Sequence, residues 1–176
     1  MFEKLQIIQY PDPRLRQLSK SVEVFDDRLK ILTQRMFELM RLDKGVGLAA
    51  PQVGINQRVF VMNYTGQPAD DRVYINPELF DITGNEEGEE GCLSLPRITA
   101  LINRGQTLRI VAKDVNGNPF EQTETGYIAR IWQHEFDHLN GVLITDRMGD
   151  VARMTHRKTL RELEKEYEAA HPKKKK

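Results

Sequence analysis

The sequence predicts an α+β fold in which antiparallel sheets pack around one central helix that carries two histidines. Three observations predict this fold. Short runs rich in Val, Ile and Tyr follow one another in the middle of the chain without intervening helical patterns, which favours antiparallel pairing over a doubly wound sheet. Asn116-Gly117 joins two such runs and is a strong hairpin signal, because both residues tolerate positive φ. A helical pattern with an apolar stripe then covers 125–141.

The size and composition of the chain predict a single domain. With 176 residues the chain can bury a core without a disulfide, and we expect a catalytic domain over 1–170 and a basic, disordered tail over 171–176. Its 26 basic and 26 acidic side chains cancel, so no global charge excess indicates nucleic acid or an anionic membrane as the main partner. Cys92 is the one cysteine, which excludes an intramolecular disulfide and fits a reducing compartment.

The N-terminal sequence lacks the apolar run of a secretory signal, and no segment approaches the roughly 20 apolar residues that span a bilayer. We therefore expect a soluble, cytoplasmic protein. An organellar protein that has lost its transit peptide would have the same sequence features.

The first third of the chain predicts a loop followed by a helix. The two prolines of "YPDPRLR" keep the residues before them extended. A helix follows within 26–45, with Asp26 or Asp27 as its N-cap and Gly45 just past its end. Its apolar positions recur at helical spacing, and they are Leu29, Leu32, Met36 and Leu39 or Met40.

Strand-like runs then occupy 58–64, 72–79 and 107–115. The segment 150–170 predicts a charged terminal helix with a thin apolar stripe, and Pro172 and four lysines end the chain. The terminal lysines suit either a contact with ribosomal RNA or a solvated tail, since clustered lysines bind phosphate through counterion release. The sequence does not decide whether the terminal helix packs on the domain or projects towards a partner.

The helix over 125–141 carries the strongest functional pattern. His134 and His138 lie at i and i+4, where Cβ atoms are about 5–6 Å apart and two imidazoles can converge on one cation. Glu135 lies one residue round the helix, where a general base can reach a water without being a ligand. Tyr127 and Ile131 share the stripe, so the histidines point where apolar side chains point. The alternative is a helix that buries two hydrogen-bonded histidines.

A catalytic metal of this kind usually has three protein ligands, so one more is needed. Downstream of the helix, His156 and the glutamates of the last helix are available, but no pattern selects them. Cys92 is the other candidate, and a buried inert thiol is its alternative interpretation. The helix motif alone would also suit a zincin-like metallopeptidase.

Three stretches together resemble a known family. In order, "GVGLAAPQ" (45–52), "EGCLS" (90–94) and "QHEFDH" (133–138) are similar to the signature motifs of peptide deformylases, and "YPDPRLR", "INPEL" and the chain length agree. The resemblance implies a peptide deformylase-like fold. It also implies a hydrolase that removes the formyl group from the N-terminal formylmethionine of newly made proteins and releases formate.

The resemblance further implies roles for individual residues. Cys92, His134 and His138 are expected to bind the metal and Glu135 to act as the acid and base. Gln52 and the backbone N–H of Leu93 are expected to stabilise the oxyanion. Ferrous iron is the metal most typical of the family, while a thiolate with two imidazoles also suits zinc, nickel or cobalt.

The family resemblance and the apolar stripe of the histidine-bearing helix also predict residues of a substrate pocket. The resemblance places Val46 and Gly47 beside the substrate, where a glycine-containing backbone can pair with a peptide. Tyr127, Ile131 and Leu95 suit the apolar wall of a methionine slot, although the first two also suit a core. We group Glu90 and Arg104 with this site as an ion pair that braces the second motif.

Two further readings of the site remain open from the sequence. The first is the zincin-like metallopeptidase, which lacks a marked downstream ligand and does not account for Cys92. The second is a non-catalytic ribosome-binding protein that holds a structural metal, which requires a fourth ligand and no role for Glu135. The partners expected under the main hypothesis are N-formylmethionyl peptides, nascent chains and, transiently, the ribosome.

Overall fold

The structure is a computed structural model and describes residues 2–172. Helix α1 (Asp27–Leu42) begins as predicted, because the Asp26 carboxylate accepts the backbone N–H of Leu29 at its N-terminus. Its apolar face is buried, and Gly45 follows its end. The "YPDPRLR" stretch differs from the predicted loop: a 3-10 helix covers Pro13–Arg16, with the Asp12 side chain accepting the N–H of Arg14.

The larger sheet has five antiparallel strands in the order β1-β2-β3-β6-β7. Their bounds are β1 (Gly47–Ala49), β2 (Val59–Met62), β3 (Arg72–Thr83), β6 (Thr107–Lys113) and β7 (Pro119–Thr125). The hairpin between β6 and β7 forms where it was predicted, but only Gly117 adopts positive φ. The Asp114 carboxylate accepts the N–H groups of Asn116 and Asn118 and thereby shapes this longer loop.

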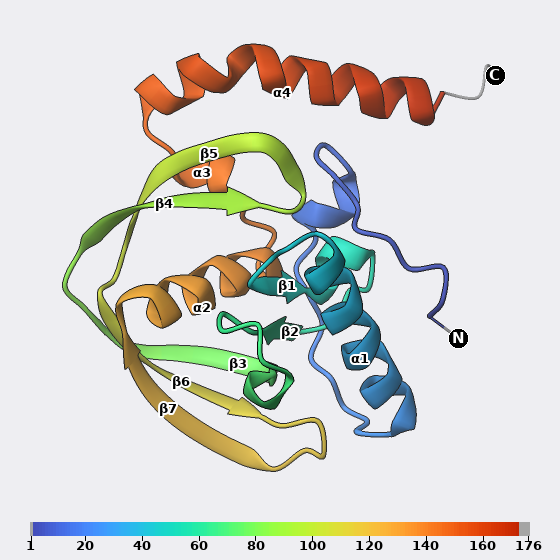
Figure 1. The fold of residues 1–176 in the computed structure, drawn as a ribbon, viewed down its shortest axis with the longest axis vertical. Helices are drawn as coiled ribbons and strands as arrows, with labels where there is room; N and C mark the ends of the chain where they lie inside the picture. Colours follow the sequence, from blue (N-terminus) through green and yellow to red (C-terminus); the bar gives the residue numbers. More distant parts are fainter. Residues whose placement is uncertain (1, 173–176) are drawn as a thin grey trace.

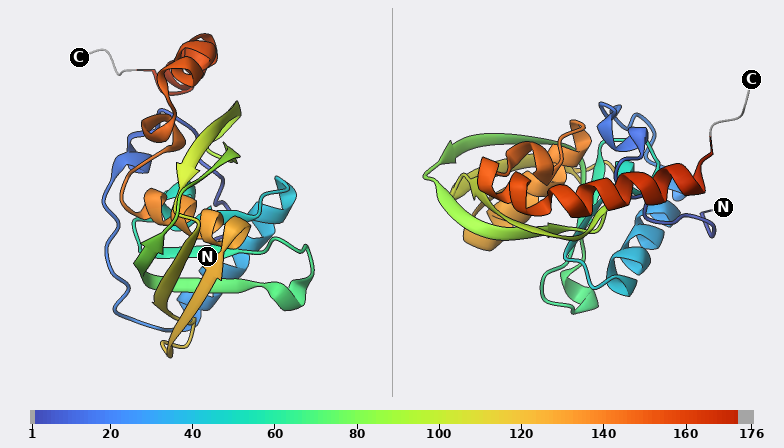
Figure 2. Two further views of the ribbon diagram at one scale, coloured as in Figure 1. Left: turned by 90° about the vertical axis from the view of Figure 1, so that its left-hand side faces the viewer. Right: turned by 90° about the horizontal axis from the view of Figure 1, so that it is seen from above.

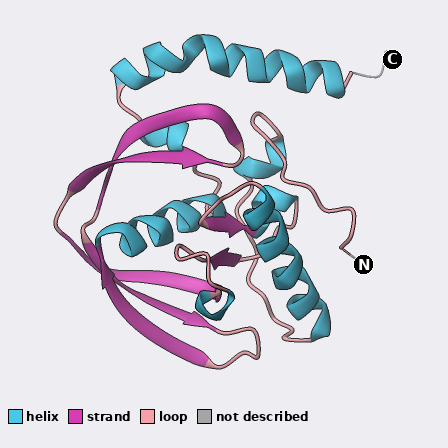
Figure 3. Cartoon of the chain, in the orientation of Figure 1, coloured by secondary structure: helices cyan, strands magenta, loops and turns pink. Residues whose placement is uncertain are grey.

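A second, two-stranded sheet pairs β4 (Glu86–Cys92) with β5 (Leu95–Arg104). No strand was predicted here from the sequence, because β4 reads EEGEEGC and both Glu and Gly are depleted in strands. In Figure 3 this hairpin stands apart from the larger sheet, and helices lie on either side of it. Its turn carries the second sequence motif.

Helix α2 (Gly126–Leu139) runs between the two sheets, with the β4–β5 hairpin on one side and the larger sheet on the other (Figure 1). Its side chains Trp132, Ala129 and Leu139 are buried against the aromatic and aliphatic residues of β2, β3 and β6. This arrangement confirms the predicted α+β class with a central histidine-bearing helix. A short helix, α3 (Ile144–Arg147), follows.

The terminal helix α4 (Asp150–Ala170) packs on the outside of the β4–β5 hairpin, as the two views of Figure 2 show. Leu163 is its buried residue and joins a cluster with Leu95, Ile102 and Leu143. Polar contacts add to this packing: Tyr10 donates to Glu164 at 2.7 Å, Arg97 pairs with Glu166 at 3.0 Å and His156 contacts the Thr99 carbonyl at 2.7 Å. The structure thus places α4 on the domain. The tail residues 173–176 lie outside the described residues.

We predict that Leu163→Ala lowers the free energy of unfolding by about 2–5 kcal/mol, because it removes a buried side chain and leaves a cavity between α4 and β5. Met154→Ala on the same helix is the control, since Met154 is 77% exposed and should change stability little. Chemical denaturation of both variants checks the prediction. Equal losses in the two variants would contradict the packing of α4 through Leu163.

Candidate metal centre and catalytic pocket

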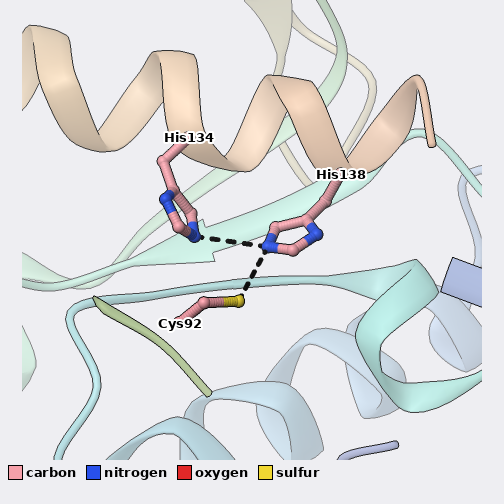
Figure 4. A group of neighbouring side chains, drawn as sticks. All are labelled: Cys92, His134 and His138. Carbon is pink, nitrogen blue, oxygen red and sulfur yellow. Dashed lines mark hydrogen bonds between the residues drawn. The ribbon is translucent and has the colours of Figure 1, made fainter. Parts of the chain in front are cut away.

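Three side chains from two parts of the chain meet between α2 and the β4–β5 hairpin. Figure 4 shows His134 and His138 pointing from α2 towards Cys92. The Cys92 Sγ lies 3.4 Å from the Nε2 of His138, which lies 3.3 Å from the Nε2 of His134. One sulfur and two nitrogen atoms therefore lie within 4.8 Å of one another, the arrangement in which a single cation can contact all three.

Local structure explains this meeting. The i, i+4 spacing stacks the two imidazoles on one face of α2. Cys92 ends β4 just before the hairpin turn, and the hairpin packs over the helix. His156, the downstream alternative, contacts the Thr99 carbonyl instead and is not part of the group. The third donor thus comes from upstream of the helix, unlike the arrangement expected of a zincin.

Glu90 orients one of the imidazoles. Its Oε2 lies 2.9 Å from the Nδ1 of His134, so this ring directs its Nε2 towards Cys92 and His138. Arg104 forms a two-fold contact with the same carboxylate, at 2.9 Å to each oxygen. Burial alone would raise the pKa of Glu90, but hydrogen bonds from Arg104 and His134 outweigh it and hold the pKa well below its usual range.

Two residues that the sequence analysis did not single out complete this network. Arg130, one turn before His134, donates to Glu90 at 3.0 Å and to the carbonyls of Glu86 and Ile102 at 2.7 and 2.8 Å. Asp137 accepts a hydrogen bond from Arg104 at 2.6 Å and is held by Arg147. Both residues lie on the helix that carries the histidines, and this position was the sequence feature that could have indicated them. Their partners could not be predicted, because they are 10 to 44 residues away in sequence.

Glu135 reaches the site because Gly47 has no side chain. A Cβ at Gly47 would lie 2.3 Å from the Oε1 of Glu135, so a larger residue would displace the carboxylate. Gly47 was expected to lie beside the substrate, and the close approach seen here is to the side chain of Glu135. Burial raises the pKa of Glu135 to about 7, and its Oε2 is buried without a hydrogen-bond partner.

Gln52 is buried beside Cys92 with a fixed amide orientation. Its Oε1 accepts the N–H of Ala49 at 2.9 Å, which leaves Nε2 as the donor towards Ser94 Oγ at 3.2 Å and Cys92 Sγ at 3.6 Å. Leu93 lies in the turn between β4 and β5 and lines the same cavity. Both expected oxyanion donors therefore lie beside Cys92.

The donor set fits a divalent metal. A thiol and two imidazoles are ligands of zinc and of first-row transition metals, and the unpaired Glu135 oxygen leaves a polar position for a water or substrate. Burial and the neighbouring His134 hold the pKa of His138 well below its usual range, which keeps that ring neutral as a ligand must be. Burial also opposes charge on His134, but the neighbouring Cys92 and Glu90 raise its pKa well above the usual range, so a metal that binds there would displace a proton from this ring.

A cavity of about 630 Å³ opens beside these groups. Most predicted pocket residues line it, and they are Val46, Gly47, Glu90, Leu95, Tyr127 and Ile131. Tyr127 is 55% exposed, so it forms an edge of the cavity and is not part of the core. Arg104 lies behind Glu90, outside this lining, and the ion pair predicted between them is present and buried.

A group of one thiol and two imidazoles that can hold a metal, beside an unpaired carboxylate and lining a cavity with apolar residues, is the arrangement typical of metal-dependent hydrolases. The family model for polypeptide deformylase matches residues 4–154, and the chain belongs to this family. It is accordingly an enzyme that removes the formyl group from N-terminal methionine.

Individual relatives agree with this assignment. The chain is 44% identical to peptide deformylase of Pseudomonas aeruginosa over 89% of this chain and 94% of the relative. It is 42% identical to peptide deformylase 1B, chloroplastic/mitochondrial, of Arabidopsis thaliana, over 93% of this chain but 61% of the longer plant protein. The crystal structure of Plasmodium falciparum peptide deformylase superposes with a TM-score of 0.93 at 40% identity, covering 96% of this chain and 100% of that one. The family resemblance is confirmed, and the metallopeptidase alternative is not supported.

We predict that Glu90→Gln weakens metal affinity about 10- to 100-fold, because the neutral amide no longer holds the His134 ring by a charged hydrogen bond. Glu87→Gln is the matched control, since Glu87 is an exposed acid on the same strand. Competition with a chromogenic chelator for Co²⁺ measures both affinities. An affinity unchanged by Glu90→Gln would show that the helix alone orients His134.

Proposed function

We propose that this chain hydrolyses N-formylmethionyl peptides at one divalent metal ion held by Cys92, His134 and His138. The observation that carries this proposal is the convergence of the three ligand atoms within 4.8 Å, with the unpaired oxygen of Glu135 beside them. A metal bound there supplies a Lewis acid that polarises the formyl carbonyl and makes water a stronger acid.

Glu135 acts as the acid and base in this proposal. With a pKa of about 7, its carboxyl group can both accept and release a proton near neutral pH. Glu135 takes a proton from the water that attacks the formyl carbon. The same proton is then delivered to the amine nitrogen of methionine as the C–N bond breaks and formate leaves.

Gln52 and Leu93 stabilise the charge that develops on the formyl oxygen. The Gln52 amide is oriented by Ala49, so its Nε2 remains a donor on the side of Cys92. The backbone N–H of Leu93 is the second donor. A donor of this kind is worth about 2.7–4 kcal/mol of transition-state stabilisation because it is fixed in advance and shielded from water.

The methionine side chain occupies the apolar part of the cavity, against Leu95, Tyr127 and Ile131. The peptide backbone pairs with the extended segment at Val46 and Gly47, which borders the cavity at the start of β1. Glu90, which Arg104 holds in place, fixes the orientation of the His134 ring and the position of the cavity wall formed by β4.

We propose Fe²⁺ as the metal, with Zn²⁺, Ni²⁺ and Co²⁺ as ions that the same ligands accept.

Residues 1–170 act as one catalytic domain in this proposal. The packing of α4 on β5 and the origin of the metal ligands in both β4 and α2 support it. None of the helices within the described residues is long and apolar enough to cross a membrane. We place the protein in the cytoplasm or an organelle, as bacterial and chloroplastic/mitochondrial relatives suggest.

We predict that Glu135→Gln retains one metal per chain and abolishes formate release, because the amide holds the shape of the side chain but moves no proton. Formate release from formyl-Met-Ala-Ser measures this, with anaerobic protein loaded with Fe²⁺ or Zn²⁺ and the acetylated peptide as substrate control. We expect rapid release by the wild type only, faster with iron, and little cleavage of the acetylated peptide. No release by metal-loaded wild type would refute the proposed function.

We further propose a transient contact of the C-terminal region with the ribosome, supported by the lysines of the sequence tail. Deleting 172–176 should leave hydrolysis of a free peptide unchanged and weaken salt-dependent binding to ribosomes. Sedimentation with purified ribosomes at low and high salt, alongside the peptide assay, checks both parts. A large loss of peptide hydrolysis would contradict the placement of the tail outside the active site.

A further inference from the structure

The β4–β5 hairpin contains an irregularity at the rim of the catalytic cavity. Gly91 pairs with Thr99, but the next residue, Cys92, pairs with Leu95. Residues 96–98 are therefore extra residues on β5 with no partners on β4. Bulges of this kind redirect side chains and are common beside active sites.

Arg97 lies at the centre of this bulge with φ of 66°. Four residues other than glycine have positive φ within the described part of the chain. Of the other three, Asn76 and Asp81 belong to types that tolerate it, and Lys44 follows the end of α1. Arg97 has neither explanation. A left-handed conformation costs a residue with a long side chain about 1–2 kcal/mol, and such costs concentrate where a side chain has a function.

Arg97 is exposed and is one of the residues that line the cavity. Three exposed charged residues line it within the described chain, namely Lys44, Glu89 and Arg97. We call these three residues the rim. Two positive charges against one negative leave the rim with a net charge of +1, whereas Arg130 and His134, deeper in the cavity, both pair with Glu90.

The only ion pair found for Arg97 among the described residues is weak and external. Its guanidinium lies 3.0 Å from the Glu166 carboxylate of α4, and the two side chains are 52% and 58% exposed. Exposed pairs contribute about 0–1 kcal/mol, so another carboxylate can replace Glu166 at little cost. Arginine also binds carboxylates through two parallel hydrogen bonds, which favours such an exchange.

We propose that Arg97, assisted by Lys44, selects formylmethionyl peptides with an acidic residue at the first or second position after methionine, and that Glu166 competes for the same guanidinium. This inference rests on the proposed function. With the formyl group beside Cys92 and the methionine side chain against Leu95 and Ile131, the following residues leave past the exposed rim. Their side chains then meet the net positive charge of Lys44, Glu89 and Arg97.

The test compares isosteric peptides with the metal-loaded full chain. Formyl-Met-Asp-Ser is measured against formyl-Met-Asn-Ser, and formyl-Met-Ser-Asp against formyl-Met-Ser-Asn. In at least one series we expect kcat/KM to be about two- to five-fold higher for the acidic peptide, the range of an exposed ion pair. The ratio should approach one near 1 M NaCl, where charges are screened within about 3 Å.

Variants assign the preference to Arg97. Arg97→Gln should reduce the Asp-to-Asn ratio to about one, and Arg97→Gly should do the same with a residue suited to positive φ. Arg97→Lys should keep part of the preference. Glu166→Gln should raise the ratio above that of the wild type, while Glu168→Gln, which removes the same charge from α4, should leave it unchanged.

A wild-type ratio of one or below in both series, or a ratio that Arg97→Gln and Arg97→Gly leave unchanged, overturns the proposal. Calorimetric binding of the unformylated products Met-Asp-Ser and Met-Asn-Ser, and of Met-Ser-Asp and Met-Ser-Asn, gives a second measurement that does not depend on turnover. If no peptide is hydrolysed, the proposed function fails. The role of Arg97 is then decided by the product affinities alone. The affinity for each acidic product is compared with that for its amide counterpart, in the wild type and in the Arg97 variants.

Discussion

The buried carboxylate of Glu90 is the constraint on which the site depends. An ionised carboxylate inside a protein costs several kcal/mol to desolvate, so it persists only with several partners. Arg104, Arg130 and His134 are those partners, and they come from β5 and from two successive turns of α2. Through Arg104 the network continues to Asp137 at the end of the helix. One charge thus joins the hairpin that carries Cys92 to the helix that carries the histidines.

The residues proposed as catalytic are buried and sterically defined, whereas the rim of the cavity is exposed. Gly47 admits the Glu135 carboxylate where a Cβ would collide with it, and Ala49 fixes the Gln52 amide. These positions restrict the reacting groups to one arrangement, as catalysis by positioning requires. At the rim, Arg97 is held by a weak, solvent-exposed pair and can exchange partners. In the function and selectivity proposed above, the reaction and the choice of peptide are therefore served by physically different parts of one cavity.

Local patterns predicted most of the elements. The central helix α2 and the terminal helix α4 lie where they were predicted, and α1 has the expected N-cap. Helix caps and helical periodicity can be predicted because they depend on residues only a few positions apart. The β4–β5 hairpin was missed, since its Glu and Gly residues have low strand propensity. Its conformation depends on distant partners. Arg130 donates hydrogen bonds to backbone carbonyls of both strands. These contacts stabilise a hairpin whose own residues have low strand propensity.

The sequence by itself indicated a catalytic metal site, because the i, i+4 spacing of the two histidines and the adjacent Glu135 on α2 are local features, whereas the reaction was implied only by the family resemblance. The resemblance of its three motifs then named the family. Only the tertiary structure decided that Cys92 meets the two histidines and that Glu90 pairs with Arg104. It also decided that Arg97 lines the cavity from an irregular strand. The physical reason is that these relations join residues 14 to 69 positions apart, whose approach is set by the packing of the hairpin between α2 and α4.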